Sequence, residues 1–168
     1  MRKIIIAAKS DNNVIGKDND LVWDLPADQR FFKKQIEGQL LITGRTSFES
    51  ALGTEVFKEN PNVLILTRQK SYSAPPAKTY ASLEAAFEYA KAAEVDKIFI
   101  LGGQKVYEAS LSLVDEIIMT EVHGTFEGDA YFPNFDLNKW EEVKREDYAS
   151  DKENAYPYSF VWYRKKSN

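Results

Sequence analysis

The sequence predicts an α/β fold in which one central, mostly parallel, twisted sheet carries helices on both faces. Short, continuous apolar runs alternate with segments whose apolar residues recur at helical spacing, and this alternation is typical of parallel strands joined by crossover helices. The 168 residues fit a single domain, 1–168, because domains commonly contain roughly 100–200 residues. After Trp140 two strand-like segments follow one another, which predicts an antiparallel hairpin at the C-terminal edge of the sheet.

The predicted strands define the sheet. Each is a short apolar run of the kind found in strands buried on both faces. These runs cover residues 4–8, 40–43, 63–67, 97–101 and 117–122, and the hairpin strands cover 141–147 and 159–165. Residues 10–20, rich in Asn and Asp, are expected to form an exposed loop. Ligands of such folds bind at the carboxyl ends of the strands, so the residues after each strand are the candidates for chemistry.

The first predicted helix begins near Pro26 and ends near Gly38. Proline suits the first helical position and glycine the residue after the last turn. Asp24 is the natural N-cap of this helix.

Three further helices are expected after the later strands. One follows Gly44-Arg45 and ends near Gly53, one is capped by Ser82, and one opens after the Gly-Gly pair at 102–103.

Composition excludes several classes of function. The chain has no cysteine and one histidine, so disulfides, thiolate metal sites and histidine-rich zinc sites are not expected. A net charge of −4 argues against nucleic acid or a membrane surface as a partner. The first apolar run is too short for a signal peptide, and no run approaches the ~20 apolar residues of a membrane span. A cytoplasmic location is the resulting expectation.

Asp28 is the carboxylate that the pattern singles out. On a helix that starts at Pro26, the residues three and four positions later share its face, and these are Phe31 and Phe32. A carboxylate among aromatic rings is poorly solvated, so its pKa should be raised. It could accept two parallel hydrogen bonds from an amidine-like heterocycle, or it could simply interact with the free amides of the first turn. The local pattern alone leaves both interpretations open.

Several motifs occur in order along nearly the whole chain, the most specific being Trp-x-Leu-Pro-x-Asp. They are Val14-Ile15-Gly16, Trp23-x-Leu25-Pro26-Ala27-Asp28, Ile42-Thr43-Gly44-Arg45, Leu101-Gly102-Gly103 and Phe126-Glu127-Gly128-Asp129 to Phe132-Pro133. In this order and spacing the chain resembles the dihydrofolate reductase family. The resemblance implies NADPH-dependent reduction of 7,8-dihydrofolate to 5,6,7,8-tetrahydrofolate, with hydride transfer to C6 and protonation at N5.

The resemblance also implies roles for individual residues around the pterin ring. Asp28 would accept hydrogen bonds from the 2-amino group and ring N3, and Thr120 would link to that carboxylate. Trp23 would hold a water near the ring, and Tyr107 would lie near both the nicotinamide and the pterin. Leu21 lies near the tip of a loop, 16–23, that would act as a lid. The remaining substrate-binding candidates are Ile6, Ala8, Gln29, Phe32, Lys33, Lys58 and Leu101.

The cofactor candidates follow three of the predicted strands. Backbone amides at a helix start bind phosphate oxygens. The resemblance places Arg68 at the adenosine 2′-phosphate, and with Arg45 nearby this pair of cations favours NADPH over NADH. The resemblance further implies a cis peptide between Gly102 and Gly103. The full set is Ala8, Ile15, Gly16, Gly44, Arg45, Thr46, Ser47, Thr67, Arg68, Gly102, Gly103, Gln104, Lys105, Val106 and Tyr107.

Four positions depart from the family pattern. Val22 replaces a common proline before Trp23, Gln29 replaces an apolar residue, and Gln104 stands where some relatives have a third glycine. The fourth departure is Asn60.

The family usually has an arginine at position 60, which holds the α-carboxylate of the folate tail. With asparagine there, we expect weaker binding of the tail, partly compensated by Lys58 or Lys33, although lysine lacks the bidentate fork of arginine. The substitution Asn60→Arg should then lower the KM for dihydrofolate.

Two alternatives stay open at this point. One is the NADPH-dependent pyrimidine reductase of riboflavin synthesis, which has a similar fold and which the missing arginine slightly favours. The other is a non-catalytic NADP-binding protein, which would have no need for Asp28 on an aromatic face. Tight binding of an antifolate such as methotrexate or trimethoprim would favour the reductase of dihydrofolate. The resemblance also implies a monomer.

Overall fold

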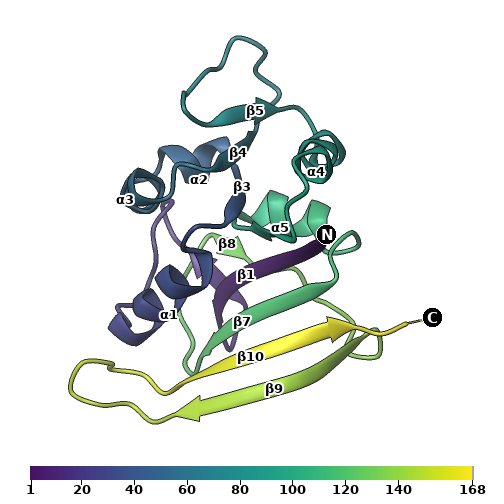
Figure 1. The fold of residues 1–168 in the computed structure, drawn as a ribbon. Helices are drawn as coiled ribbons and strands as arrows, with labels where there is room; N and C mark the ends of the chain where they lie inside the picture. Colours follow the sequence, from purple (N-terminus) through teal and green to yellow (C-terminus); the bar gives the residue numbers. More distant parts are fainter. Residues whose placement is uncertain (168) are drawn as a thin grey trace.

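The computed structural model describes residues 1–167, and Figure 1 shows them as one twisted sheet with helices on both faces. The eight strands lie in the order β5-β4-β3-β6-β1-β7-β10-β9, and β2 and β8 form a separate antiparallel pair. The pairs from β5 to β7 are parallel, whereas β10 is antiparallel to both of its neighbours. The predicted α/β class and the antiparallel edge hairpin are therefore confirmed.

The elements have the following bounds. The strands are β1 (Arg2–Ser10), β2 (Val14–Gly16), β3 (Leu40–Gly44), β4 (Val63–Leu66), β5 (Lys78–Tyr80), β6 (Lys97–Ile100), β7 (Glu116–Val122), β8 (Ala130–Tyr131), β9 (Trp140–Tyr148) and β10 (Tyr158–Lys165). The helices are α1 (Pro26–Ile36), α2 (Arg45–Glu49), α3 (Ala51–Glu59), α4 (Leu83–Ala92) and α5 (Gln104–Ser110).

The structure corrects the sequence-based expectations for residues 10–20 and for Gly53. The stretch 10–20 is not only an exposed loop, because it contains β2, whose Val14 is fully buried. Gly53 does not end the helix after β3; it lies inside α3, where a Cβ would overlap the carbonyl oxygen of Ser47. The chain instead breaks at Ser50, whose hydroxyl accepts a hydrogen bond from the Gly53 amide and caps α3.

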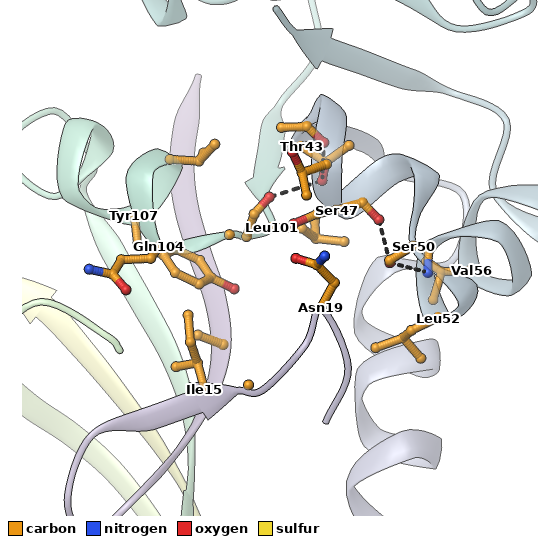
Figure 2. Close-up of a pocket in the computed structure, with 18 of the residues that line it drawn as sticks. Ile15, Asn19, Thr43, Ser47, Ser50, Leu52, Val56, Leu101, Gln104 and Tyr107 are labelled. Carbon is orange, nitrogen blue, oxygen red and sulfur yellow. Dashed lines mark hydrogen bonds between the residues drawn. The ribbon is translucent and has the colours of Figure 1, made fainter. Parts of the chain in front are cut away.

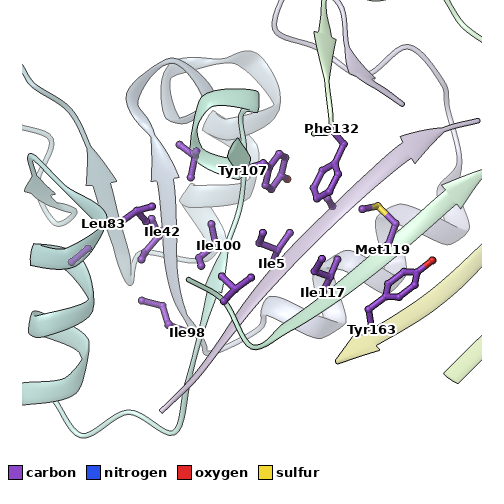
Figure 3. Close-up of a cluster of buried hydrophobic side chains, with 14 of the residues drawn as sticks. Ile5, Ile42, Leu83, Ile98, Ile100, Tyr107, Ile117, Met119, Phe132 and Tyr163 are labelled. Carbon is purple, nitrogen blue, oxygen red and sulfur yellow. The ribbon is translucent and has the colours of Figure 1, made fainter. Parts of the chain in front are cut away.

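The core lies on both faces of the sheet because successive residues of a strand point to opposite faces. In β1, Ile5 packs with the cluster that Figure 3 shows, whereas Ile4 and Ile6 pack on the opposite face. Leu83 of α4 and Tyr107 of α5 belong to the first cluster, while Ile36 of α1 belongs to the second. The sheet is thus fixed between two helical layers, and its strand ends are held in place.

The start of α1 is fixed by a residue far away in the sequence. Asn154, in the turn between β9 and β10, is buried, and its Oδ1 accepts a 3.0 Å hydrogen bond from the amide of Ala27. Asp151 holds Asn154 by accepting from its backbone amide and from Nδ2. The predicted N-cap, Asp24, is wrong: Leu25 is at the cap position, and the side chain of Asp24 accepts a hydrogen bond from the side chain of Gln29.

Within residues 1–167, no helix has the length and apolar composition that crossing a membrane requires.

Candidate active site

A cavity of about 1370 Å³ opens at the carboxyl ends of the parallel strands. It is lined by residues at the ends of β1, β3, β4 and β6, by α1, and by the segment before α1. Figure 2 shows Thr43 and Leu101 on its sheet side and Ile15 and Asn19 on the opposite side. The topology thus brings together segments that are far apart in the sequence, as α/β sheets do at their carboxyl edge.

Asp28 lies in this cavity as a buried carboxylate, 8% exposed. Thr120, on β7, donates a 2.7 Å hydrogen bond from Oγ1 to its Oδ1. Burial raises the pKa of Asp28 and the hydrogen bond from Thr120 partly offsets this, so that the pKa is about 6. Within residues 1–167, Thr120 is the one side-chain partner of this carboxylate. The side chain of Asp28 therefore accepts a hydrogen bond from β7, and the alternative that it interacts only with the free amides of the first turn is wrong.

Aromatic rings cover the carboxylate from the α1 side. Phe31 and Phe32 are half-buried and line the cavity. The ring of Phe31 stacks on Phe160 of β10, with centroids 3.9 Å apart, and meets Trp162 edge-on. These contacts fix α1 against the sheet, and the burial of Asp28 on this helix is the cause of its raised pKa.

Tyr107 and the Gly-Gly segment form the centre of the cavity. The hydroxyl of Tyr107 donates a 3.0 Å hydrogen bond to the carbonyl of Ile6, and Thr43 donates a 2.9 Å bond to the carbonyl of Gly102. Burial raises the pKa of Tyr107 well above its usual range, so this group stays protonated and acts as a donor. The peptide between Gly102 and Gly103 is cis, as expected.

The opposite half of the cavity is rich in backbone amides and cations. Gly44 and Gly103 are the N-cap residues of α2 and α5, and neither helix start has a side-chain cap. A Cβ at Gly103 would lie 3.2 Å from the Ser47 hydroxyl, so glycine leaves the approach to these amides open.

Two arginines lie in this half. Arg45 forms a 3.0 Å ion pair with Glu49, and its guanidinium lies 6.0 Å from the centre of the Tyr72 ring. Arg68 is exposed and has no ion pair within the described part of the chain. An unpaired guanidinium beside free amides is suited to a phosphate group.

The predicted lid, 16–23, is a tight turn at the edge of the cavity. Lys17 and Asp20 exchange backbone hydrogen bonds, and Asn19, Asp20 and Leu21 line the cavity. The amide of Asp18 donates a 3.0 Å bond to the carboxylate of Asp129. The turn is thus held from the segment before β8.

The structure brings nearly all predicted site residues into this one cavity, with two exceptions. Lys58 points away from it, since only its neighbours on α3 line the wall. Trp23 is buried behind the wall against Phe126, and its Nε1 has no hydrogen-bond partner within residues 1–167.

Other lining residues were missed from the sequence. They lie mainly on the outer turns of α1 and α3 and in the lid, and include Asn19, Asp20, Phe31, Ser50, Leu52, Glu55, Val56, Phe57, Glu59 and Asp129. The helical spacing of Phe31 pointed to an apolar face, but no signal distinguishes a cavity wall from the core. In the described residues, no group of three or more His, Cys, Asp and Glu side chains is arranged to hold a metal ion.

Comparison with known proteins identifies the family to which this site belongs. The family model described as dihydrofolate reductase matches residues 3–165. The chain belongs to the dihydrofolate reductase family. It is 35% identical over 163 residues to the dihydrofolate reductase of Bacillus subtilis (strain 168), covering 97% of this chain and 94% of that protein. It is 39% identical over 160 residues to that of Neisseria gonorrhoeae, covering 95% of each.

A solved structure of the same family has the same fold. It is dihydrofolate reductase from Enterococcus faecalis complexed with NADP(H) and RAB-propyl, with a TM-score of 0.87 and 31% identity over 99% of this chain and 97% of the other. The dihydrofolate reductase fold therefore extends over nearly the whole chain.

Proposed function

We propose that this protein reduces 7,8-dihydrofolate to 5,6,7,8-tetrahydrofolate with NADPH, as a monomeric, single-domain enzyme of the cytoplasm. The observation that carries the proposal is the buried pair of Asp28 and Thr120 at one end of a cavity whose other end holds free amides and Arg68. A lone carboxylate among aromatic rings suits a flat heterocycle with adjacent N–H donors, because such a ring offers it two parallel hydrogen bonds. The dihydrofolate reductase family match supports the same reading.

The residues of the second half fit a dinucleotide phosphate. The starts of α2 and α5, after Gly44 and Gly103, have no side-chain cap and so leave first-turn amides for a phosphate, and Arg45 and Arg68 add positive charge. NADPH would be held by these groups and by Thr46, Ser47 and Thr67. When bound, it supplies the hydride.

The chain's own residues orient the pterin and manage its proton. Asp28 would hold the 2-amino group and ring N3, and Thr120 would keep one carboxylate oxygen in place through its 2.7 Å bond. Because the pKa of Asp28 is near 6, the carboxyl can exchange a proton near neutral pH and so support protonation at N5. Fixing both reactants in one geometry can contribute roughly 7–11 kcal/mol at best.

The walls would exclude water from the reaction. Phe31 and Phe32 cover the pterin side, and Leu21 in the lid 16–23 faces the cavity. Closure of such a loop shields the reacting atoms and often limits product release. The buried indole N–H of Trp23 would be satisfied by a water beside the ring, since buried polar groups need partners.

Two measurements test the proposal. NADPH oxidation, followed by absorbance, should require dihydrofolate, and methotrexate should abolish it at a concentration close to that of the enzyme. Oxidation without dihydrofolate dependence would contradict the proposal, as would activity that methotrexate leaves unchanged. In that case the ribosylamino-pyrimidine of riboflavin synthesis is the next substrate to test. Light scattering on a sizing column checks the monomer.

A further inference from the structure

The outer end of the cavity, between α1 and α3, has a charge that does not suit an anionic ligand. Three charged residues line it: Lys33 on α1, and Glu55 and Glu59 on α3. The Nζ of Lys33 lies 2.9 Å from Oε2 of Glu59. The one lysine is therefore already neutralised, and Glu55 leaves the rim with an excess of negative charge. We call these three residues the rim.

The ion pair within the rim holds the lysine in its charged form. The hydrogen bond from Lys33 to Glu59 raises the pKa of the lysine. Both side chains are more than half exposed, so the pair is screened by solvent, and releasing Lys33 for another anion would require breaking it. A ligand carboxylate at this place would gain little from Lys33 and would face two glutamates.

The other polar groups of this end do not add a cation. Asn60 ends α3, and its Nδ2 donates a 2.9 Å hydrogen bond to the carbonyl of Val56. This amide therefore serves the last turn of its own helix. Gln29 is neutral, and Lys58 lies outside the cavity.

Apolar side chains form the rest of the same wall. Phe32 from α1 and Leu52, Val56 and Phe57 from α3 line it, and Leu52 is 39% exposed. Such a surface favours an aromatic or aliphatic group, because burying apolar area is favourable whatever the charge of the ligand beyond it.

We propose that this reductase does not select for an anionic tail on its pterin substrate, and that it reduces dihydropterins with uncharged tails about as well as dihydrofolate. The inference rests on the proposed function. The rim pair Lys33–Glu59 and the neutral Asn60 are the specificity-determining residues, and the apolar wall between them recognises the middle of the substrate.

The test compares two substrates of the same shape. One is dihydrofolate, and the other is its derivative in which both glutamate carboxylates are carboxamides. For the wild-type enzyme, the two kcat/KM values should agree within about threefold, since a single solvent-exposed ion pair contributes little to binding. A preference of more than about tenfold for dihydrofolate would overturn the proposal.

Two variants locate the cause. Glu59→Gln frees Lys33, and Asn60→Arg adds a cation; each should lower the KM for dihydrofolate about two- to fivefold and leave kcat unchanged. The KM for the diamide should stay the same in both variants. The control is Glu153→Gln, which breaks a comparable exposed ion pair of α1, that with Arg30, outside the cavity. Equal effects on both substrates would contradict a role for rim charge.

The experiment distinguishes an error in the proposed function from an error in the proposed substrate selectivity. If neither substrate supports NADPH oxidation, the proposed function is wrong and this proposal is overturned with it. If dihydrofolate is reduced and the diamide is not, the function stands and the selectivity proposal alone is wrong.

Discussion

The two halves of the cavity differ in how their charges are held. In the half formed by α2, α5 and the end of β4, Arg68 is exposed and the two helix starts have no side-chain cap. In the half formed by α1, the carboxylate of Asp28 is buried beneath aromatic rings. In the first half the charge stays solvated, so ionisation costs little free energy, but salt screens its attraction for a ligand. In the second half burial disfavours the charged form of Asp28, so a ligand with N–H donors would stabilise that charge. The predictions below test this contrast, from the largest expected effect to the smallest.

Removing the buried charge should have the largest effect. Asp28→Asn cannot accept two parallel hydrogen bonds, each worth about 1.5–3 kcal/mol when charge-assisted, so kcat/KM for dihydrofolate should fall by roughly a hundredfold or more. The Kd for NADPH, measured by fluorescence quenching, should not change. Asp24→Asn is the matched control, because Asp24 is an exposed carboxylate at the same helix start. If NADPH binding also fell, the two halves would not be independent.

Removing the exposed charge should affect only the cofactor. Arg68→Ala should raise the KM for NADPH by roughly tenfold, the value of one charge-assisted hydrogen bond to phosphate. The KM for NADH, which lacks the 2′-phosphate, should stay the same. Arg30→Ala, on the far side of α1, serves as the control. A parallel loss with NADH would show that Arg68 acts on something other than this phosphate.

The buried carboxylate should also make stability depend on pH. Because the pKa of Asp28 is raised to about 6 in the folded protein, the unfolded chain releases this proton first as the pH rises. Between about pH 4 and 6 the wild type should therefore lose stability, and the loss should persist above pH 6. Relative to Asp28→Asn, it should amount to about 2 kcal/mol between pH 4 and 7. Urea unfolding of both proteins at the two pH values measures it; an unchanged difference would contradict the pKa.

The smallest effect concerns the link between the cofactor half and the lid. Gln104, at the start of α5, accepts a 2.8 Å hydrogen bond from the amide of Tyr131 in β8 and donates a 2.8 Å bond to Glu108. Gln104→Ala removes this tie to the strand that pairs with β2, so the KM for NADPH should rise about two- to fivefold. Glu108→Ala, which leaves the bond to Tyr131 in place, should change it less. If the two variants raised the KM for NADPH equally, the effect would come from the Gln104–Glu108 bond within α5 and not from the bond to Tyr131.

The sequence predicted the long elements well and the short ones poorly, for a physical reason. The strands β1, β3, β4, β6 and β7 are buried on both faces and are therefore continuous apolar runs. The strands β2, β5 and β8 have two or three residues each, which is too few for a periodicity. Gly53 resembled a helix stop, but it is the close contact with the Ser47 carbonyl that requires glycine there.

The same limit applies to the site. Asp28 was found from its aromatic face, and its contact with Thr120, 92 residues later, came from the family resemblance. The direction of Lys58 and the pairing of Lys33 with Glu59 depend on how α1 and α3 approach each other. No local pattern contains that geometry, so the cation expected to compensate for Asn60 could not be chosen correctly from the sequence.

The cap that Asn154 provides for α1 has a consequence for synthesis of the chain. The helix that carries Asp28 is among the first segments to leave the ribosome, yet its first-turn amide waits for a partner 127 residues later. Thr120 likewise lies between β1 and β10, opposite Ala8 and Phe160. A nascent chain stalled before Asn154 therefore lacks both the cap and the neighbouring strand β10. The end of the cavity that holds Asp28 and Thr120 becomes complete only once β10 has been synthesised.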